Sequence, residues 1–369
     1  MTSPPAIPLN DLRRHNASVA GELAAAIARV TASGWYIGGQ ELEAFESAFA
    51  RYCGTAHCIG VANGTDALEL ALRAAGVRAG DEVLTVANAG MYSSTAILAV
   101  GARPVYVDIV PDTLLMDTGC LGSTAGPGAR AVVATHLYGR MLDMDQLTHV
   151  AQRSGLTVIE DCAQAHGASR NGRRAGGHGA IGCFSFYPTK NLGALGDAGA
   201  LVTDDDGLMA RLRALRQYGW SSKYVAGIAG GRNSRLDELQ AAVLTAKLPH
   251  LERWNSRRRE IARRYTEGIV HNDICTSPYA ESAFVAHLYV VRTPRRDALR
   301  AHLTGLGIGT DIHYPVPDHL QQALARAGSS PALPVTEAAA REVLSLPCFP
   351  DMTDDEVDRV VMACNTWEA

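Results

Sequence analysis

The sequence predicts an α/β protein in which a mostly parallel sheet is covered by helices on both faces and followed by a smaller α+β domain. Short runs rich in Val, Ile and Leu alternate with amphipathic segments in the first part of the 369-residue chain. This alternation is typical of parallel strands joined by helices. Beyond Asn233 helical patterns dominate. We therefore expect a large domain over residues 1–250 and a small domain over residues 251–369.

The expected elements of the large domain follow from the spacing of its apolar residues. Two helices open it, over residues 18–33 and 41–52. Short apolar runs then predict strands over residues 58–62, 82–87, 104–109, 131–137, 157–160, 182–186 and 199–203. Further helices are expected over residues 63–75, 94–100, 145–153 and 208–216.

The C-terminal part has a different pattern, with longer helices and fewer strands. Helices are predicted over residues 235–250, from there to residue 267, and over residues 296–303, 319–325 and 337–344. Strands are predicted over residues 287–292 and 309–313. This mixture predicts an α+β domain.

Charge and cysteine usage exclude several classes of function. The net charge of −4 gives no electrostatic basis for binding nucleic acid or an anionic membrane. No apolar run is long enough to span a bilayer. The eight cysteines lack the paired spacing of a metal site, so we expect free thiols and no metal. The N-terminus has no signal-peptide pattern, and we expect a soluble cytoplasmic protein.

Lys190 is the residue with the clearest chemical meaning. It follows the apolar run over residues 182–186 and precedes the glycine-rich stretch over residues 193–199. Lysine normally belongs on a solvated surface. At the end of a buried strand its pKa is lowered, and the neutral amine can form a Schiff base. The neighbouring glycines, which let a ligand approach the backbone, favour this interpretation over that of a surface lysine.

Asp161 ends a second apolar strand, and Gln164 and His166 follow in the same loop. Considered alone, the carboxylate would more simply stabilise a loop, and the other two residues would be structural hydrogen-bonding groups. Together with Lys190, however, Asp161 completes the pair that a pyridoxal phosphate (PLP) site requires. The lysine forms a Schiff base with the aldehyde of PLP, and the acid stabilises the protonated nitrogen of its pyridine ring.

The stretch Asn63-Gly64-Thr65-Asp66 lies where a strand is expected to end and a helix to begin. Amides at a helix N-terminus favour phosphate, Gly64 permits close approach and Thr65 adds a hydroxyl. Plain N-capping by Thr65 or Asp66 explains the same residues when they are considered alone. The order of these features favours one ligand site at the carboxyl ends of the strands. Residues 193–199 do not form a GxGxxG fingerprint, which argues against a nicotinamide dehydrogenase.

The chain resembles the DegT/DnrJ/EryC1/StrS sugar aminotransferase family, a branch of the fold-type I PLP enzymes. The resemblance covers essentially the whole chain and is most specific around Lys190. It is carried by residues 34–39, 62–68, 159–167, 184–193, 233–242 and 312–315. It implies the fold-type I architecture, with a mostly parallel mixed sheet between helices and a smaller C-terminal domain.

The resemblance also implies roles for individual residues. Lys190 matches the lysine that binds the cofactor aldehyde, and Asp161 matches the acid that faces the pyridine nitrogen. The other implied cofactor contacts are Gly64, Thr65 and Ser185 at the phosphate, Gln164 near the phenolic oxygen, and Tyr92 over the ring. The match of Tyr92 needs an offset, because the family often has Asn-Thr-Phe where this chain has residues 88–92.

Other implied residues lie toward the substrate or a second subunit. Asn233 matches a residue that reaches the phosphate in the neighbouring subunit, which implies a homodimer with shared active sites. Tyr187, His313 and Tyr314 are candidates for substrate contact. Packing between the two domains explains these three residues equally well.

The implied reaction transfers an amino group from glutamate to a keto group on a nucleotide-linked sugar, in the biosynthesis of deoxyamino sugars such as those of antibiotics. Residues 216–224 and 311–317 look most like those of members that act at C3 of dTDP-3-keto-6-deoxyhexoses. Amination at C4, or of a cyclitol ketone, stays open. Some relatives have histidine at the lysine position and dehydrate their substrate, so Lys190 favours transfer. A PLP-binding regulator without enzymatic activity is a further alternative, but no helix-turn-helix segment or basic patch supports it.

Overall fold

A computed structural model describes residues 5–324 and 332–368 of the chain. Its centre is a seven-stranded sheet in the order β1-β9-β8-β5-β4-β2-β3. β9 runs antiparallel to its neighbours β8 and β1, and the other neighbouring strands are parallel. The strands are β1 (His57–Val61), β2 (Glu82–Thr85), β3 (Arg103–Tyr106), β4 (Ala129–Thr135), β5 (Thr157–Asp161), β8 (Ile181–Ser185) and β9 (Gly199–Thr203). This confirms the predicted α/β class and the mostly parallel sheet.

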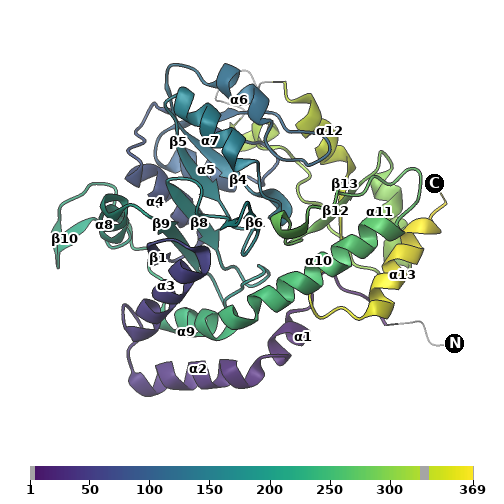
Figure 1. Ribbon diagram of the computed structural model, residues 1–369, viewed down its shortest axis with the longest axis horizontal. Coiled ribbons are helices and arrows are strands. Elements are labelled where there is room, and N and C mark those ends of the chain that lie inside the picture. The colour runs from purple at the N-terminus through teal and green to yellow at the C-terminus, as the bar shows by residue number, and fades with distance from the viewer. Residues whose placement is uncertain (1–4, 325–331, 369) are drawn as a thin grey trace.

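Helices cover both faces of the sheet, as predicted (Figure 1). Alternate residues of one strand enter two separate apolar cores, because successive side chains of a strand point to opposite faces. In β4, Val132 packs in a core with residues of α3 and α7, and Val133 packs in a core with residues of α4, α5 and α8. The helices of this part are α2 (Ala20–Ser33), α3 (Gln40–Cys53), α4 (Gly64–Ala74), α5 (Tyr92–Ala99), α6 (Thr118–Thr124), α7 (Met144–Arg153), α8 (Asp206–Leu215) and α9 (Glu238–Lys247).

The C-terminal part is built on the long helix α10, which follows α9 and runs toward α13 (Figure 1). A two-stranded antiparallel sheet of β12 and β13 shares an apolar core with these helices. The elements are α10 (Leu251–Gly268), β12 (Tyr289–Arg292), α11 (Arg296–Gly305), α12 (Pro334–Glu342), β13 (Val343–Leu346) and α13 (Asp354–Asn365). The division that we expected at residue 250 coincides with the start of α10 and stays a prediction.

The beginning of the chain joins the C-terminal part. Ile7 forms a parallel bridge with Ile308. The short helix α1 (Leu12–Ala17) follows, and its Arg14 pairs with Glu356 at 2.7 Å. Among the described residues, no helix is long and apolar enough to cross a membrane.

Two predictions in the C-terminal part are wrong. The expected strand over residues 309–313 makes a single bridge, between Asp311 and Ser345. The partner of β12 is instead β13, part of which we had placed in a helix over residues 337–344. The run Val343–Leu346 is buried throughout although it includes Ser345, and so short a buried run cannot be assigned to strand or helix by its periodicity. Pro315 and Pro317 restrict the backbone after residue 313.

Other predicted elements differ in smaller ways. The expected helix over residues 319–325 is a pair of 3-10 turns, Asp318–Leu320 and Gln322–Leu324, and residue 325 lies outside the described residues. The helices α1 and α6 were not predicted. Neither were the hairpins β6 (Ser169–Arg170) with β7 (Arg173–Arg174), and β10 (Trp220–Ser222) with β11 (Val225–Ala226). Figure 1 shows the β10–β11 hairpin projecting from the body of the molecule beside α8.

Candidate active site

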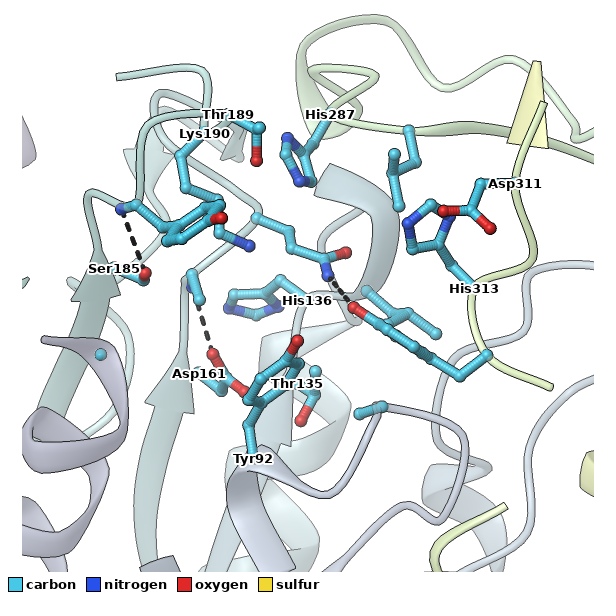
Figure 2. Close-up of a pocket in the computed structure, with 18 of the residues that line it drawn as sticks. Tyr92, Thr135, His136, Asp161, Ser185, Thr189, Lys190, His287, Asp311 and His313 are labelled. Atoms are coloured by element: carbon cyan, nitrogen blue, oxygen red, sulfur yellow. Dashed lines mark hydrogen bonds between the residues drawn. The ribbon is translucent and has the colours of Figure 1, made fainter. Parts of the chain in front are cut away.

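A cavity of about 830 Å³ opens at the carboxyl ends of β4, β5 and β8 and at the N-termini of α4 and α5. Ligands bind at this edge of open α/β sheets. Residues from the C-terminal part, among them His287 and residues 311–314, line the other side (Figure 2). Every site residue named from the sequence lines this cavity except Asn233.

The turn after β8 positions Lys190. Its backbone N–H donates to the carbonyl of Tyr187 at 2.8 Å. The next side chain, Asn191, donates to Asn255 Oδ1 on α10 at 2.9 Å. Figure 2 shows the half-buried Lys190 side chain reaching from this turn into the cavity. Burial lowers the pKa of Lys190 to about 8, although the charge of Asp161 acts in the opposite direction. A substantial minority of the amine is therefore neutral at physiological pH, far more than for an exposed lysine.

Asp161 is the last residue of β5 and is buried at the base of the cavity. Its Oδ1 accepts a hydrogen bond from Ala163 N–H at 3.1 Å, and its Oδ2 accepts one from the Ser93 hydroxyl at 3.4 Å. Burial raises the pKa of Asp161, and the Ala163 amide and the charge of Lys190 offset only part of that rise. A cationic ligand group placed against this carboxylate would stabilise its ionised form.

His136 lines the cavity directly after β4, and the sequence analysis did not identify it. Its Nδ1 accepts from Leu142 N–H at 3.2 Å, so Nε2 carries the proton and donates to Glu160 at 3.0 Å. Glu160 also accepts the backbone N–H groups of Gly176, His178 and Gly179, at 2.9, 2.7 and 2.6 Å. Burial raises the pKa of Glu160, but these hydrogen bonds outweigh burial and lower it overall. The tautomer and orientation of the imidazole are thereby fixed.

Gln164 connects the two sides of the cavity. Its Oε1 accepts the backbone N–H of Tyr138 at 2.6 Å, and its Nε2 donates to the Tyr314 hydroxyl at 3.1 Å. The Tyr138 hydroxyl in turn donates to the carbonyl of His313. The segment that carries Tyr314 is therefore tied to the sheet through Gln164 and Tyr138.

The N-terminus of α4 and the end of β8 form a narrow cradle. A Cβ atom added at Gly64 would lie 2.6 Å from the Cβ of Ser185, so only glycine permits this approach. The hydroxyls of Thr65 and Ser185 line the cavity beside the first amides of α4. The alternative interpretation was that Thr65 or Asp66 caps the helix. The N-cap of α4 is instead Asn63, whose side chain accepts a hydrogen bond from Asp66 N–H at 2.8 Å. Thr65 and Asp66 are therefore not the N-cap of α4.

Aromatic side chains form the rim of the cavity. Tyr92 begins α5, and its ring centroid lies 6.1 Å from that of Tyr314 at an angle of 76°. Tyr187 is 52% exposed. His313 Nδ1 lies 2.8 Å from Ser345 Oγ, and burial lowers the pKa of His313, so that the ring is neutral at pH 7. The three tyrosines and His313 all line the cavity.

Asn233 lies apart from this cavity. Its backbone pairs with Gln217 in an antiparallel bridge close to the β10–β11 hairpin, and its side chain is exposed. It does not line the cavity of its own chain.

The residues present fit pyridoxal phosphate. The glycine-permitted cradle, with helix amides and the hydroxyls of Thr65 and Ser185, has the chemistry of a phosphate site. The amine of Lys190 suits the aldehyde, and the buried carboxylate of Asp161 suits a protonated ring nitrogen.

Several cavity residues had no strong sequence signal. His136 follows a strand as Asp161 ends one, but we had included it in the strand predicted over residues 131–137. Leu9, Asn10, His287 and Asp311 reach the cavity through long-range packing, which no local pattern reveals.

Comparison with known proteins gives consistent matches over the whole chain. The sequence model of the DegT/DnrJ/EryC1/StrS aminotransferase family matches residues 18–365. A dTDP-3-amino-3,4,6-trideoxy-alpha-D-glucose transaminase of Streptomyces venezuelae is 46% identical over 98% of this chain and 96% of its own length. The erythromycin biosynthesis sensory transduction protein EryC1 of Saccharopolyspora erythraea is 45% identical over 96% of this chain and 98% of its own. The crystal structure of S. venezuelae DesV in complex with a ketimine intermediate has a TM-score of 0.95 at 46% identity, and 99% of each chain is covered.

Proposed function

This chain belongs to the DegT/DnrJ/EryC1/StrS aminotransferase family, and from that premise we propose that it transfers an amino group from glutamate to the C3 keto group of a dTDP-linked keto-deoxyhexose. Family membership makes the chain a PLP-dependent sugar aminotransferase. The sugar carbon, the nucleotide and the amino donor are the parts that we propose.

The observation that carries the proposal is the intact site combined with the name of a close relative. That relative, at 46% identity, is a transaminase for a dTDP sugar that carries its amino group at C3. The cradle at Gly64, the amine of Lys190 and the carboxylate of Asp161 are all present around one cavity. The same residues argue against a purely regulatory role, which would not require a lysine whose pKa is lowered to about 8.

The chain's own residues have distinct tasks in this proposal. Bound PLP supplies an electrophilic aldehyde and a ring that withdraws electrons from the carbon next to the amine. Lys190 would hold the aldehyde carbon until the amine of the donor takes its place, and the freed lysine amine would then move a proton to and from the reacting carbon. With a pKa of about 8, a large fraction of its amine is neutral near pH 8 and able to accept that proton. Asp161 would keep the ring nitrogen protonated, and Thr65 and Ser185 would bind the phosphate.

An assay with defined keto sugars tests the reaction. Purified protein with PLP and glutamate is incubated with dTDP-3-keto-6-deoxyhexose generated in situ, and NMR locates the new amine. The 4-keto isomer and a cyclitol ketone serve as the alternative acceptors. Amination of the 3-keto sugar at C3 is expected. Exclusive turnover of the 4-keto isomer or the cyclitol would overturn the C3 assignment, and replacing glutamate with other amino acids tests the donor.

We also propose that the active unit is a homodimer with shared sites. Among the residues that the structure describes, Lys190 is the single lysine lining the cavity, and no arginine lines it. A sugar diphosphate normally requires such cations, which a second chain could supply. The β10–β11 hairpin projects from the body (Figure 1) and exposes Tyr218, Tyr224 and Val225, and the exposed Asn233 lies at its base. Exposed aromatic residues on a projecting hairpin favour an interface.

A complementation experiment tests the shared site. Chains with Lys190→Ala are mixed with chains carrying Asn233→Asp, whose added carboxylate should repel the phosphate. In a mixed dimer one site would carry both lesions and the other site neither, so activity should return after subunit exchange. Absence of recovery after verified exchange would mean that Asn233 does not complete a partner's site.

We further propose that the protein works in the cytoplasm. All eight cysteines are free thiols, and Cys120 and Cys275 among them are exposed. Free thiols persist in a reducing compartment. Fractionation of the producing cell with detection of the protein tests this assignment.

A further inference from the structure

The first turn of α5 connects the cavity to a buried carboxylate that lies outside it. Tyr92 lines the cavity. The next hydroxyl, of Ser93, donates to Asp161 Oδ2 at 3.4 Å. The hydroxyl after that, of Ser94, donates to Asp318 Oδ2 at 2.6 Å. A displacement of this single turn would therefore alter an aromatic wall and a contact of Asp161 together.

Asp318 is held against this turn by several contacts. Its side chain is 1% exposed and belongs to a 3-10 turn of the C-terminal part. Oδ1 accepts the backbone N–H of Met91 at 2.9 Å, and its own N–H donates to the carbonyl of Ala87 at 2.7 Å. The Ser94 hydroxyl lies 2.9 Å from the hydroxyl of Tyr106 on β3.

The geometry of Met91 explains why α5 needs this carboxylate. Met91 is the N-cap residue of α5, has a φ of 69°, and makes no side-chain capping hydrogen bond. A non-glycine residue rarely adopts that conformation unless its surroundings hold it there. A carboxylate near the first amides of a helix also interacts favourably with the helix dipole. Asp318 therefore supplies from a distant part of the chain what the local sequence lacks.

We infer that Asp318 is a positioning residue that fixes the first turn of α5, and with it Tyr92 and Ser93, relative to Asp161 and Lys190. This inference rests on the proposed function, because it assumes that Tyr92 and Asp161 face the cofactor. Asp318 acts through α5 and does not line the cavity.

The charge of Asp318 makes the arrangement sensitive to pH. Burial raises the pKa of Asp318 to about 6, while the Ser94 hydroxyl and the Met91 amide oppose this rise. The other groups nearby are the Tyr106 hydroxyl, and His319, which lies 3.2 Å from Glu337. Above pH 6 both carboxylate oxygens accept hydrogen bonds. Below pH 6 a proton occupies one of them, and the hold on α5 weakens.

Two variants and a matched control test the inference in the PLP-loaded enzyme. Asp318→Ala removes both acceptors and should lower kcat/KM roughly 10- to 100-fold, since small misplacements in an active site have effects of this size. Asp318→Asn retains the shape and one acceptor, so its loss should be smaller. Asp117→Asn alters the N-cap of α6, where Asp117 accepts from Gly119 N–H at 2.9 Å, and should leave kcat/KM unchanged.

Three further measurements separate positioning from stability. The visible circular dichroism of the bound cofactor should change in Asp318→Ala. The acid limb of kcat/KM near pH 6 should flatten in Asp318→Asn, which cannot titrate. Because the folded state raises the pKa of Asp318, the ionised carboxylate opposes folding at neutral pH, so Asp318→Asn should melt at the same or a higher temperature.

The outcomes are distinguishable. If both variants keep wild-type kcat/KM, dichroism and pH profile, the inference is wrong even if they melt at lower temperature. If the wild-type protein does not transaminate at all, the proposed function has failed, and the dichroism of Asp318→Ala still tests whether Asp318 positions α5.

Discussion

The two sides of the cavity have different origins. The sheet wall consists of His136, Asp161 and Ser185, at the carboxyl ends of β4, β5 and β8. The facing wall includes residues 287–288 and 311–314, which lie outside helices and strands. Backbone ladders align the sheet wall, as in the pairing of Thr135 with Asp161, whereas side-chain hydrogen bonds such as that of Tyr314 with Gln164 fix the facing wall. We expect lesions in the sheet wall to abolish chemistry and lesions in the facing wall to weaken substrate binding.

The largest effect is expected at Lys190, on the turn that extends the sheet wall. Lys190→Ala should lower turnover on the order of 10⁴-fold or more, because the group that moves the proton is lost. Lys247 is a matched control, since burial lowers its pKa to about 8 as well, but its amine donates to Asn16 Oδ1 and to the carbonyl of Gly193, both at 2.9 Å. Borohydride reduction of the PLP-loaded protein followed by peptide mapping should label Lys190. Labelling of Lys247 instead would refute the assignment.

The next largest effect is expected at Asp161. Asp161→Asn should lower kcat on the order of 10³-fold while the protein still binds PLP, because a neutral amide cannot hold the ring nitrogen protonated. Single-turnover kinetics with glutamate measure the loss of kcat, and equilibrium binding of PLP tests whether the variant still binds the cofactor. Near-normal turnover would remove Asp161 from the mechanism.

A third prediction concerns the support beneath the sheet wall. Glu160→Gln replaces a buried acceptor of four hydrogen bonds and should lower the free energy of unfolding by about 3 kcal/mol. The folded-state pKa of Glu160 is lowered, so its contribution to stability is present above about pH 4.5 and is lost as the pH falls through the folded value. Urea unfolding of the wild-type protein and of Glu160→Gln at pH 7 and at pH 4 measures how much stability the substitution removes at each pH. Equal losses at both values would contradict this account.

The smallest effect is expected in the facing wall. His313→Gln should raise the KM for the nucleotide sugar about tenfold with little change in the spectrum of bound PLP, because one hydrogen-bonding side chain is altered and the sheet wall stays intact. Ser345→Ala removes the partner of His313 Nδ1 and should give a weaker version of the same change. A large fall in kcat for His313→Gln would show that the two walls are not separable.

The different origins of the two walls also explain which parts of the site could be predicted from the sequence. The positions of Asp161, Ser185 and Gly64 follow from the predicted strands, because the first two residues lie at strand ends, Gly64 lies shortly after one, and parallel strands bring their carboxyl ends to one edge. The facing wall could not be derived in this way. Asp311 makes one bridge where a strand was expected, and its partner Ser345 lies in a strand whose first two residues the sequence pattern assigned to a helix. Asp318 contacts α5 across more than two hundred residues of chain, which no local pattern encodes.

The pairing of Ile7 with the segment around Ile308 has a consequence for the order in which the protein folds during translation. Its N–H donates to the carbonyl of Gly307 at 2.9 Å, and Gly309 N–H donates back to its carbonyl at 2.8 Å. Nearby Leu9 and Asn10 line the cavity. The last strand of the sheet ends at Thr203, so the sheet can assemble while the remainder is still being translated. Residues 7–10 can take their places only after the segment around Ile308 has been synthesised, and capture of the cofactor is therefore expected to be among the final steps of folding.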